Sequence, residues 1–221
     1  MIPSSPATRL FAGFLRLFFD HLYTTLAWAY DFVAWSSSAG QWDTWRSAAL
    51  TWIPSTGRVL ELGPGTGHLL LALHRRGLAA MGLERSRQMT RILRHRLTAA
   101  IGTVPVARGL AQAQPFASGS IDSVVSTFPS EYILDPKTLS EIDRTLRPGG
   151  CLVIVTGAWP KGPRGVDRLA GWLYRATGQA LAPDGPWTKA LQDSTIPLQV
   201  ETVVLRRGVV VVLHGQKPSA R

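Results

Sequence analysis

Apolar residues in the middle of the chain form short continuous runs, separated by segments in which apolar residues recur at helical spacing. The short runs predict buried strands at residues 57–62, 79–84, 103–108, 120–127 and 150–156. The segments between them predict helices at residues 66–76, 86–99 and 136–146. This alternation predicts an α/β fold, a doubly wound and mostly parallel sheet with right-handed crossovers.

The two ends of the chain depart from this alternation. Helices are expected over residues 8–34, 40–53 (capped by Ser37 or Ser38) and 163–177. Residues 198–205 and 209–213 predict a closing antiparallel hairpin, and residues from 215 onward are expected to be disordered. The predicted division is an N-terminal helical extension or lid (1–53), one α/β domain (54–215) and a tail (216–221).

Three glycines at alternate positions follow the first predicted strand. Residues 59–67 read Val-Leu-Glu-Leu-Gly-Pro-Gly-Thr-Gly, so Gly63, Gly65 and Gly67 form a G-x-G-x-G loop that leads into a helix. Such a loop can bring backbone amides against a ligand. The spacing differs from the G-x-G-x-x-G of dinucleotide enzymes, and no Gly-Lys-Ser/Thr follows. Glu61, two residues before the first glycine, favours a cationic, amine-bearing ligand.

A second acid stands at the end of the next predicted strand. Glu84 lies 17 residues after Gly67, at the position where a carboxylate can accept from both hydroxyls of a ribose. The alternative is that Glu84 is a solvated strand end.

These segments together resemble the class I S-adenosylmethionine-dependent methyltransferases, specifically the type 11 group that methylates small molecules, quinones and lipids. The resemblance covers roughly residues 55–157 and rests on residues 59–67, 82–89, 109–116, 121–128 and 146–150. It implies a Rossmann-like seven-stranded sheet in the order 3-2-1-4-5-7-6 with strand 7 antiparallel. It also implies S-adenosylmethionine as the cofactor.

The resemblance assigns a cofactor site residue by residue. The expected cofactor-binding residues are Glu61, Gly63, Gly65, Gly67, Glu84, Met89, Ala111, Gln112 and Ser126. Glu84 would take the ribose hydroxyls, and Met89 or Ser86 would flank the adenine. Relatives carry Gly-Asp-Ala after the third strand, where the Asp accepts from the adenine amino group. Here Leu110 replaces that Asp, so adenine selectivity must rest on backbone groups or on Gln112.

Methyl transfer requires alignment of donor and acceptor, and a base only when the acceptor is protonated. The candidate catalytic residues are His68, Glu131, Tyr132 and the lid residue Tyr30. Of these, His68 or Glu131 could serve as the base, and each has a structural alternative. The acceptor is expected near residues 126–132 and lid residue Trp35. Residues 126–129 read Ser-Thr-Phe-Pro and lack the Asn/Asp-Pro-Pro-Tyr/Phe pattern, which argues against adenine or glutamine N-methylation.

The net charge of +10 is uneven, with +6 carried by residues 54–100, where Arg87, Arg91 and Arg94 share one helix face. This face is either solvated or attracted to a polyanion, an acidic membrane or RNA. Residues 8–35 combine an amphipathic helix with tryptophans, which suits a lid alone or a lid that also contacts an anionic membrane. Charged residues interrupt every possible membrane span, and no signal peptide is predicted.

The sequence therefore predicts an enzyme that methylates a small or amphiphilic acceptor, with a lipid head group or quinone-like ring favoured. The alternatives are an rRNA or tRNA methyltransferase, and a binding protein that has the methyltransferase fold without the activity. Cys151 is expected to be a core thiol, and no histidine or cysteine set has metal-ligand spacing. A cytoplasmic location fits, either free or peripheral on the inner membrane face.

Overall fold

The computed structural model describes residues 41–102, 105–160, 194–206 and 208–219. The predicted N-terminal helix with Tyr30 and Trp35, and the predicted helix at 163–177, lie outside the described residues. The predicted lid and its membrane contact therefore remain predictions.

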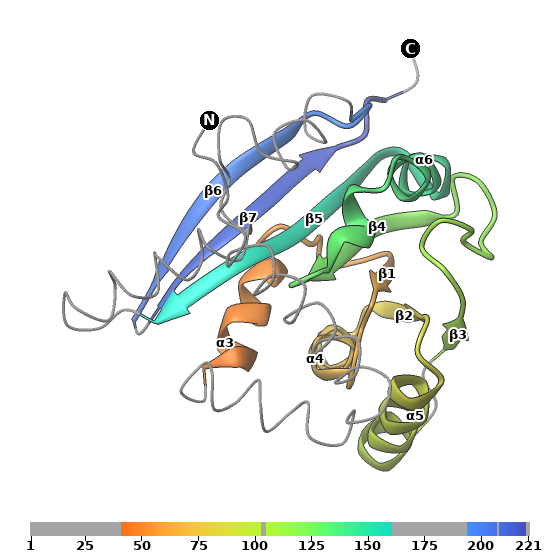
Figure 1. Cartoon of the computed structure of the whole chain (residues 1–221), viewed down its shortest axis with the longest axis vertical. Helices are drawn as coiled ribbons and strands as arrows, with labels where there is room; N and C mark the ends of the chain where they lie inside the picture. Colours follow the sequence, from red (N-terminus) through yellow and green to blue (C-terminus); the bar gives the residue numbers. More distant parts are fainter. Residues whose placement is uncertain (1–40, 103–104, 161–193, 207, 220–221) are drawn as a thin grey trace, which may run out of the picture.

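Seven strands form one sheet in the order β3-β2-β1-β4-β5-β7-β6 (Figure 1). The strands are β1 Arg58–Leu62, β2 Ala79–Glu84, β3 Val106–Arg108, β4 Ile121–Thr127, β5 Leu146–Pro160, β6 Leu198–Leu205 and β7 Gly208–Gln216. Strands β1 to β5 pair in parallel, whereas β7 runs antiparallel to both β5 and β6. The predicted strand order and the antiparallel seventh strand are confirmed.

Helices cover both faces of this sheet (Figure 1). They are α3 Trp42–Ser47, the 3-10 helix η2 Ala48–Thr51, α4 His68–Arg75, α5 Arg87–Ile101, the 3-10 helix η3 Glu131–Leu134 and α6 Pro136–Thr145. Consecutive residues of a strand point to opposite faces of the sheet, because side chains alternate along a strand. Val59 packs with the buried residues of α3, η2, α4 and α5, whereas Leu60 packs with those of η3 and α6. Residues 42–53 thus share the core of the α/β domain.

Several helix ends differ from the sequence predictions. Gly67 has a φ of 85°, which is left-handed, so α4 begins at His68 rather than at residue 66. The predicted helix over residues 40–53 is an α-helix only to Ser47 and then tightens into η2. Its predicted capping by Ser37 or Ser38 is wrong, because Gln41 occupies the N-cap position and makes no side-chain capping bond.

The C-terminal side is more extensively paired than the sequence predicts. Strand β5 runs to Pro160 because β7 pairs with it antiparallel from Cys151 to Pro160. Strand β7 continues to Gln216, and Lys217 then exchanges two backbone hydrogen bonds with Gly149 and Gly150. The expected disorder from residue 215 is therefore wrong for residues 215–217, because main-chain pairing continues there.

Cys151 lies in the core, as predicted. Its side chain is buried, its Sγ donates a hydrogen bond to Ser123 Oγ at 3.0 Å, and burial raises the pKa of the thiol. In the described part of the chain, no helix is both long enough and apolar enough to cross a bilayer.

Candidate active site

The site residues come together because β1, β2 and β4 are parallel neighbours. Glu61 pairs in register with Gly82 of β2 and with Val125 of β4. The carboxyl ends of these strands therefore reach the same edge of the sheet, where ligands bind in open α/β folds.

The loop between β1 and α4 has the glycines where backbone geometry requires them. Gly63, Gly65 and Gly67 have φ values of 67°, 55° and 85°, a region that residues with a Cβ rarely adopt. The Gly63 N–H donates to Leu83 O at 3.0 Å, and the Gly67 N–H donates to Pro64 O at 2.9 Å. The loop is thus a fixed turn tied to β2.

Glu61 is a buried carboxyl beneath this loop. It is 1% exposed, and its Oε2 has no hydrogen-bond partner among the described residues. Burial raises the pKa of Glu61 to about 8, with nearby Glu84 adding to the rise and Arg46 opposing it. An unpartnered buried carboxyl oxygen indicates a binding position for a cation.

Glu84 holds the other side of the loop. One of its carboxyl oxygens accepts from the Gly65 N–H at 3.2 Å and the other from the Ser86 N–H at 2.7 Å. Burial raises the pKa of Glu84, while these two N–H groups oppose the rise. Ser86 caps α5 by accepting from the Met89 N–H, and the Met89 side chain is buried. Glu84 is therefore not a solvated strand end.

Ser126 and Tyr132 lie next to Gly63 and hydrogen-bond the end of β1. Both hydroxyls donate to the carbonyl of Leu62, at 2.8 and 3.0 Å, and they lie 2.9 Å from each other. A Cβ on Gly63 would approach Tyr132 Oη to 2.6 Å. The Tyr132 hydroxyl thus fixes the end of β1, which is a positioning role.

The loop after β3 approaches the same edge of the sheet. Leu110 is 48% exposed, so about half of this apolar side chain is open to solvent. Gln112 Nε2 donates to Asp135 Oδ2 at 3.1 Å. The Lys137 N–H also donates to Asp135, and the Lys137 and Gln112 hydrogen bonds together lower the pKa of Asp135. Ala111 packs against the buried core residues that surround Leu60 on the α6 face of the sheet.

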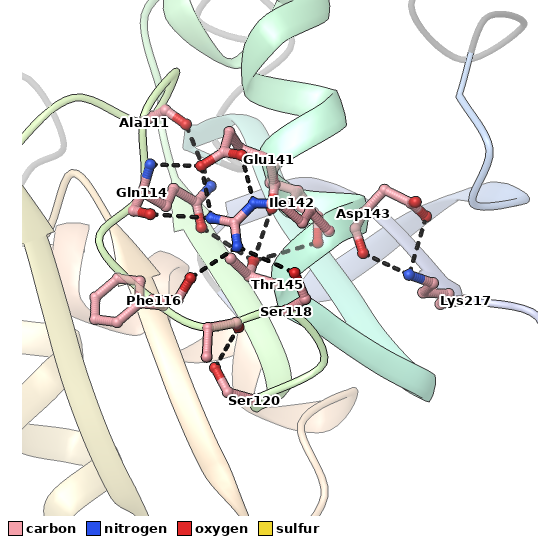
Figure 2. A network of polar contacts seen from close by, with 12 residues as sticks. Ala111, Gln114, Phe116, Ser118, Ser120, Glu141, Ile142, Asp143, Thr145 and Lys217 are labelled. Atoms are coloured by element: carbon pink, nitrogen blue, oxygen red, sulfur yellow. Dashed lines mark hydrogen bonds and ion pairs between the residues drawn. The ribbon is translucent and has the colours of Figure 1, made fainter.

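A polar network from α6 anchors this loop (Figure 2). Glu141 Oε2 accepts from the Gln114 N–H at 2.6 Å, and Arg144 donates to the carbonyls of Gln114 and Phe116 at 3.0 and 2.8 Å. The Arg144 guanidinium bonds both carboxyl oxygens of Glu141 and lowers its pKa. No sequence motif signals this anchor; the only local sign is that Glu141 and Arg144 stand three apart on one helix face.

The remaining candidate catalytic residues are differently placed. His68, the first residue of α4, has its Nδ1 3.2 Å from Asp43 Oδ1. Glu131 begins η3 and is exposed. Tyr30 lies outside the described residues. The structure therefore brings one candidate base, His68, next to a carboxylate that can orient it.

Aromatic rings cover the end of β4. Phe128 has a φ of 50° and stacks on Trp42, with ring centroids 4.3 Å apart. The guanidinium of Arg46 lies over the same Trp42 ring, 5.5 Å from its centroid. Arg46 is 7% exposed, and no sequence motif signals that burial.

Comparison with known proteins decides the family. The methyltransferase domain family matches residues 60–154. A demethylmenaquinone methyltransferase of Thermus thermophilus is 32% identical over 167 residues, which cover 73% of this chain and 74% of that protein. The chain belongs to the class I S-adenosylmethionine-dependent methyltransferases, in the type 11 group.

Other members of the methyltransferase family are more distant. A methyltransferase of Mycobacterium tuberculosis is 28% identical over 159 residues, covering 69% of this chain and 60% of that protein. The chain thus spans less than two thirds of that relative's length. Phosphoethanolamine N-methyltransferase 2 of Haemonchus contortus, in complex with S-adenosyl-L-methionine, has a TM-score of 0.64 at 18% identity, covering 90% of this chain and 60% of that one. That likeness shows the shared fold.

The residues of this methyltransferase fit its family's cofactor. The unpartnered Glu61 oxygen suits the ammonium of the methionine moiety, and Glu84 has the acceptor atoms that ribose hydroxyls need. The positive-φ glycines leave no Cβ between backbone and ligand.

Proposed function

We propose that this methyltransferase methylates a planar, quinone-like ring of a small amphiphilic acceptor. The observation that carries the proposal is the Phe128–Trp42 stack at the end of β4. The left-handed backbone of Phe128 costs about 1–3 kcal/mol, and strain of this kind clusters at functional sites. An aromatic surface favours a planar ring. The Thermus thermophilus relative, named for demethylmenaquinone, supports the same acceptor class.

The chain's own residues bind and align the reactants. When bound, S-adenosylmethionine supplies an electrophilic methyl group, so the protein needs no nucleophile of its own. Glu61 would hold the ammonium and Glu84 the ribose, with the glycine loop between them. Alignment of this kind contributes about 7–11 kcal/mol to a two-reactant step.

His68 is the residue best placed to accept a proton. A hydroquinone ring carbon becomes nucleophilic when the neighbouring hydroxyl loses its proton. Asp43 can accept from the Nδ1–H of His68 across 3.2 Å, which makes Nε2 the basic nitrogen. Asp43 is then a positioning residue and His68 the general base.

The test is methyl transfer by the full-length protein from S-adenosylmethionine to a reduced, short-chain demethylmenaquinone analogue. Parallel reactions contain phosphatidylethanolamine or an unmodified RNA. We expect S-adenosylhomocysteine to form with the quinol, together with a product heavier by one methyl group. Methylation of the lipid or the RNA, without methylation of the quinol, would contradict the proposed acceptor. Cofactor binding without methyl transfer to any of the three would favour a binding protein that has the fold without the activity.

A matched pair of histidine variants tests the base. His68→Gln should reduce turnover by about 100-fold or more, within the range for general base catalysis, and Asp43→Asn by less. His74→Gln, on the same helix and exposed, should leave turnover unchanged. Equal effects of His68→Gln and His74→Gln would show that His68 has no catalytic role.

A further inference from the structure

We propose that a hollow lined by Arg87, Thr90, Arg91, Arg94 and Arg108 is a second ligand site that binds a phosphate group, separate from the methyl-transfer site. The hollow has a volume of about 380 Å³ and lies between α5 and the edge strand β3. Figure 1 shows these two elements side by side at one end of the sheet. Its volume is in the range of small-molecule sites.

The charges around the hollow are of one sign. Residues 85–120 contain six arginines and not a single Asp or Glu. In the described part of the chain, no carboxylate lies within ion-pair range of Arg87, Arg91, Arg94 or Arg108. These positive charges therefore have no counter-charge from the described protein, and an anion is the ligand that the hollow attracts.

The fold holds these cations together in spite of their repulsion. Arg87, Arg91 and Arg94 lie on one face of α5 at spacings of four and three, where like charges disfavour the helix. Arg87 also stands in the first turn, where the helix dipole disfavours a positive charge. Arg94 Nη2 donates to Val106 O of β3 at 3.0 Å, which fixes one guanidinium against the strand.

The lining selects phosphate over a nucleobase. The described lining consists of four arginines and one threonine, with no aromatic ring, whereas single-stranded RNA binding uses aromatic rings for base stacking. Guanidinium groups bind phosphate with charge-assisted bonds in a fixed geometry. The ligand is thus a phosphorylated head group of a lipid or a soluble phosphorylated molecule.

The hollow is also next to the glycine loop of residues 63–67 with Glu61 and Glu84, which together are called the cofactor cradle. Arg108 pairs in register with Glu84 on the neighbouring strand, and Arg87 follows Ser86, the cap of α5. A ligand in the hollow would lie on the outer side of the cradle, where it could hold the methyltransferase at an anionic surface without entering the methyl-transfer site.

The experiment compares two double variants of the full-length protein. Arg87→Gln/Arg91→Gln removes two charges from the hollow, and Arg75→Gln/Arg206→Gln removes two exposed charges elsewhere. The probes are inorganic pyrophosphate in calorimetry, vesicles of phosphatidylcholine with or without phosphatidylglycerol in co-sedimentation, and a single-stranded RNA in fluorescence anisotropy. Cofactor affinity of both variants serves as the check that they are folded.

We expect the hollow variant to lose about tenfold or more in affinity for the phosphate probe, and the control variant about twofold at most because solvent screens its charges. Loss for the phosphatidylglycerol vesicles identifies a lipid head group, and loss for pyrophosphate alone identifies a soluble ligand. Equal losses in both variants, no binding of either phosphate probe, or binding of RNA more tightly than both would overturn the proposal.

Discussion

Glu61 couples cofactor binding to pH. Its carboxyl is buried, with a pKa raised to about 8, so in the free protein it is neutral at pH 7. An ammonium group binds well only to the ionised form. We therefore expect cofactor affinity to rise by up to about tenfold per pH unit as the pH increases toward 8, measured by calorimetry. Glu61→Gln should bind weakly with a flat profile, and a flat profile in the unchanged protein would contradict the assignment.

The same carboxyl should make the free protein less stable as the pH rises. The pKa of Glu61 in the folded state lies above the value of 4.5 that applies when it is exposed. Between these two values the unfolded chain releases a proton that the folded chain keeps, so unfolding becomes more favourable with increasing pH. Thermal unfolding without cofactor from pH 5 to pH 8 should show this decline, and Glu61→Gln should reduce it. The raised pKa of Glu84 acts in the same direction.

Gly65 tests the backbone of the cradle. Gly65→Val should abolish cofactor binding, because a β-branched residue is strained at a φ of 55° and places its side chain at the ligand face. Gly77→Val is the matched control, since Gly77 has a φ of 79° with open space around it, away from the loop. Both variants should lose stability, but only the first should lose the cofactor in calorimetry. Retained affinity in Gly65→Val would show that the loop is not the cradle.

Leu110 tests the departure from the family pattern. Leu110→Asp should tighten cofactor binding by about 1 kcal/mol, a typical value for one gained hydrogen bond, since the exposed apolar side chain gives way to an acceptor for the adenine amino group. Ala113→Asp adds the same charge at an exposed position of the same loop and should have no such effect. Weaker binding in Leu110→Asp would mean that Leu110 packs on the adenine face.

At the scale of elements, helix α6 determines where the loop after β3 lies. The Arg144 guanidinium joins Glu141 to the carbonyls of Gln114 and Phe116 (Figure 2), and Thr145 Oγ1 donates to Gln114 Oε1 at 3.0 Å. A loop of irregular backbone needs such partners, because its own N–H and C=O groups have no ladder to join. The helix on one face thus positions the segment expected to contact the adenine.

Removing this anchor should therefore affect both binding and stability. Arg144→Gln should lower stability by about 1–2 kcal/mol, seen as a fall of a few degrees in melting temperature, and should weaken cofactor binding. Arg147→Gln is the control, because Arg147 contacts Asp122 instead of the loop. If Arg147→Gln weakens cofactor binding as much as Arg144→Gln does, the anchor has no specific role.

At the scale of the whole molecule, local patterns were sufficient to predict the sheet and the position of the glycine loop. Each parallel strand contains a short apolar run, and the connecting helices begin and end within a few residues of their predicted positions. The loop was predictable because left-handed backbone favours glycine. Gly63, Gly65 and Gly67 stand at the three positions of the loop that have positive φ values. The place of Glu84 at a strand end next to that loop was predictable, whereas its burial was not, because a solvated strand end has the same sequence.

Contacts between distant segments could not be read from the sequence. The burial of Arg46 beside Glu61, and the pairing of Asp43 with His68, depend on how α3 packs against α4. The length of β5 depends on β7, which joins it from the far end of the chain. No periodicity within residues 150–160 contains that information, because an antiparallel partner extends a strand without changing its composition.

The C-terminal segment closes the fold at the edge of the sheet opposite to the active site. The Lys217 N–H donates to Gly150 O at 2.8 Å, and its carbonyl accepts from the Gly149 N–H at 2.9 Å. Its Nζ donates to the carbonyls of Asp143 and Leu146, at 2.5 and 3.3 Å. These bonds tie the start of β5, where that strand enters the sheet, whereas the cofactor cradle lies at the ends where the parallel strands leave it.

Truncation should therefore separate stability from binding. Ending the chain at Gln216 removes two backbone and two side-chain hydrogen bonds, so it should lower the free energy of unfolding by about 2–4 kcal/mol. Ending it at Lys217 keeps these bonds and should have little effect. Well below the melting temperature, both truncated proteins should bind S-adenosylmethionine as the full chain does, because neither truncation changes a residue at the cradle edge. Weakened binding in the chain that ends at Gln216, measured at a temperature where it is fully folded, would show that the two edges of the sheet are coupled.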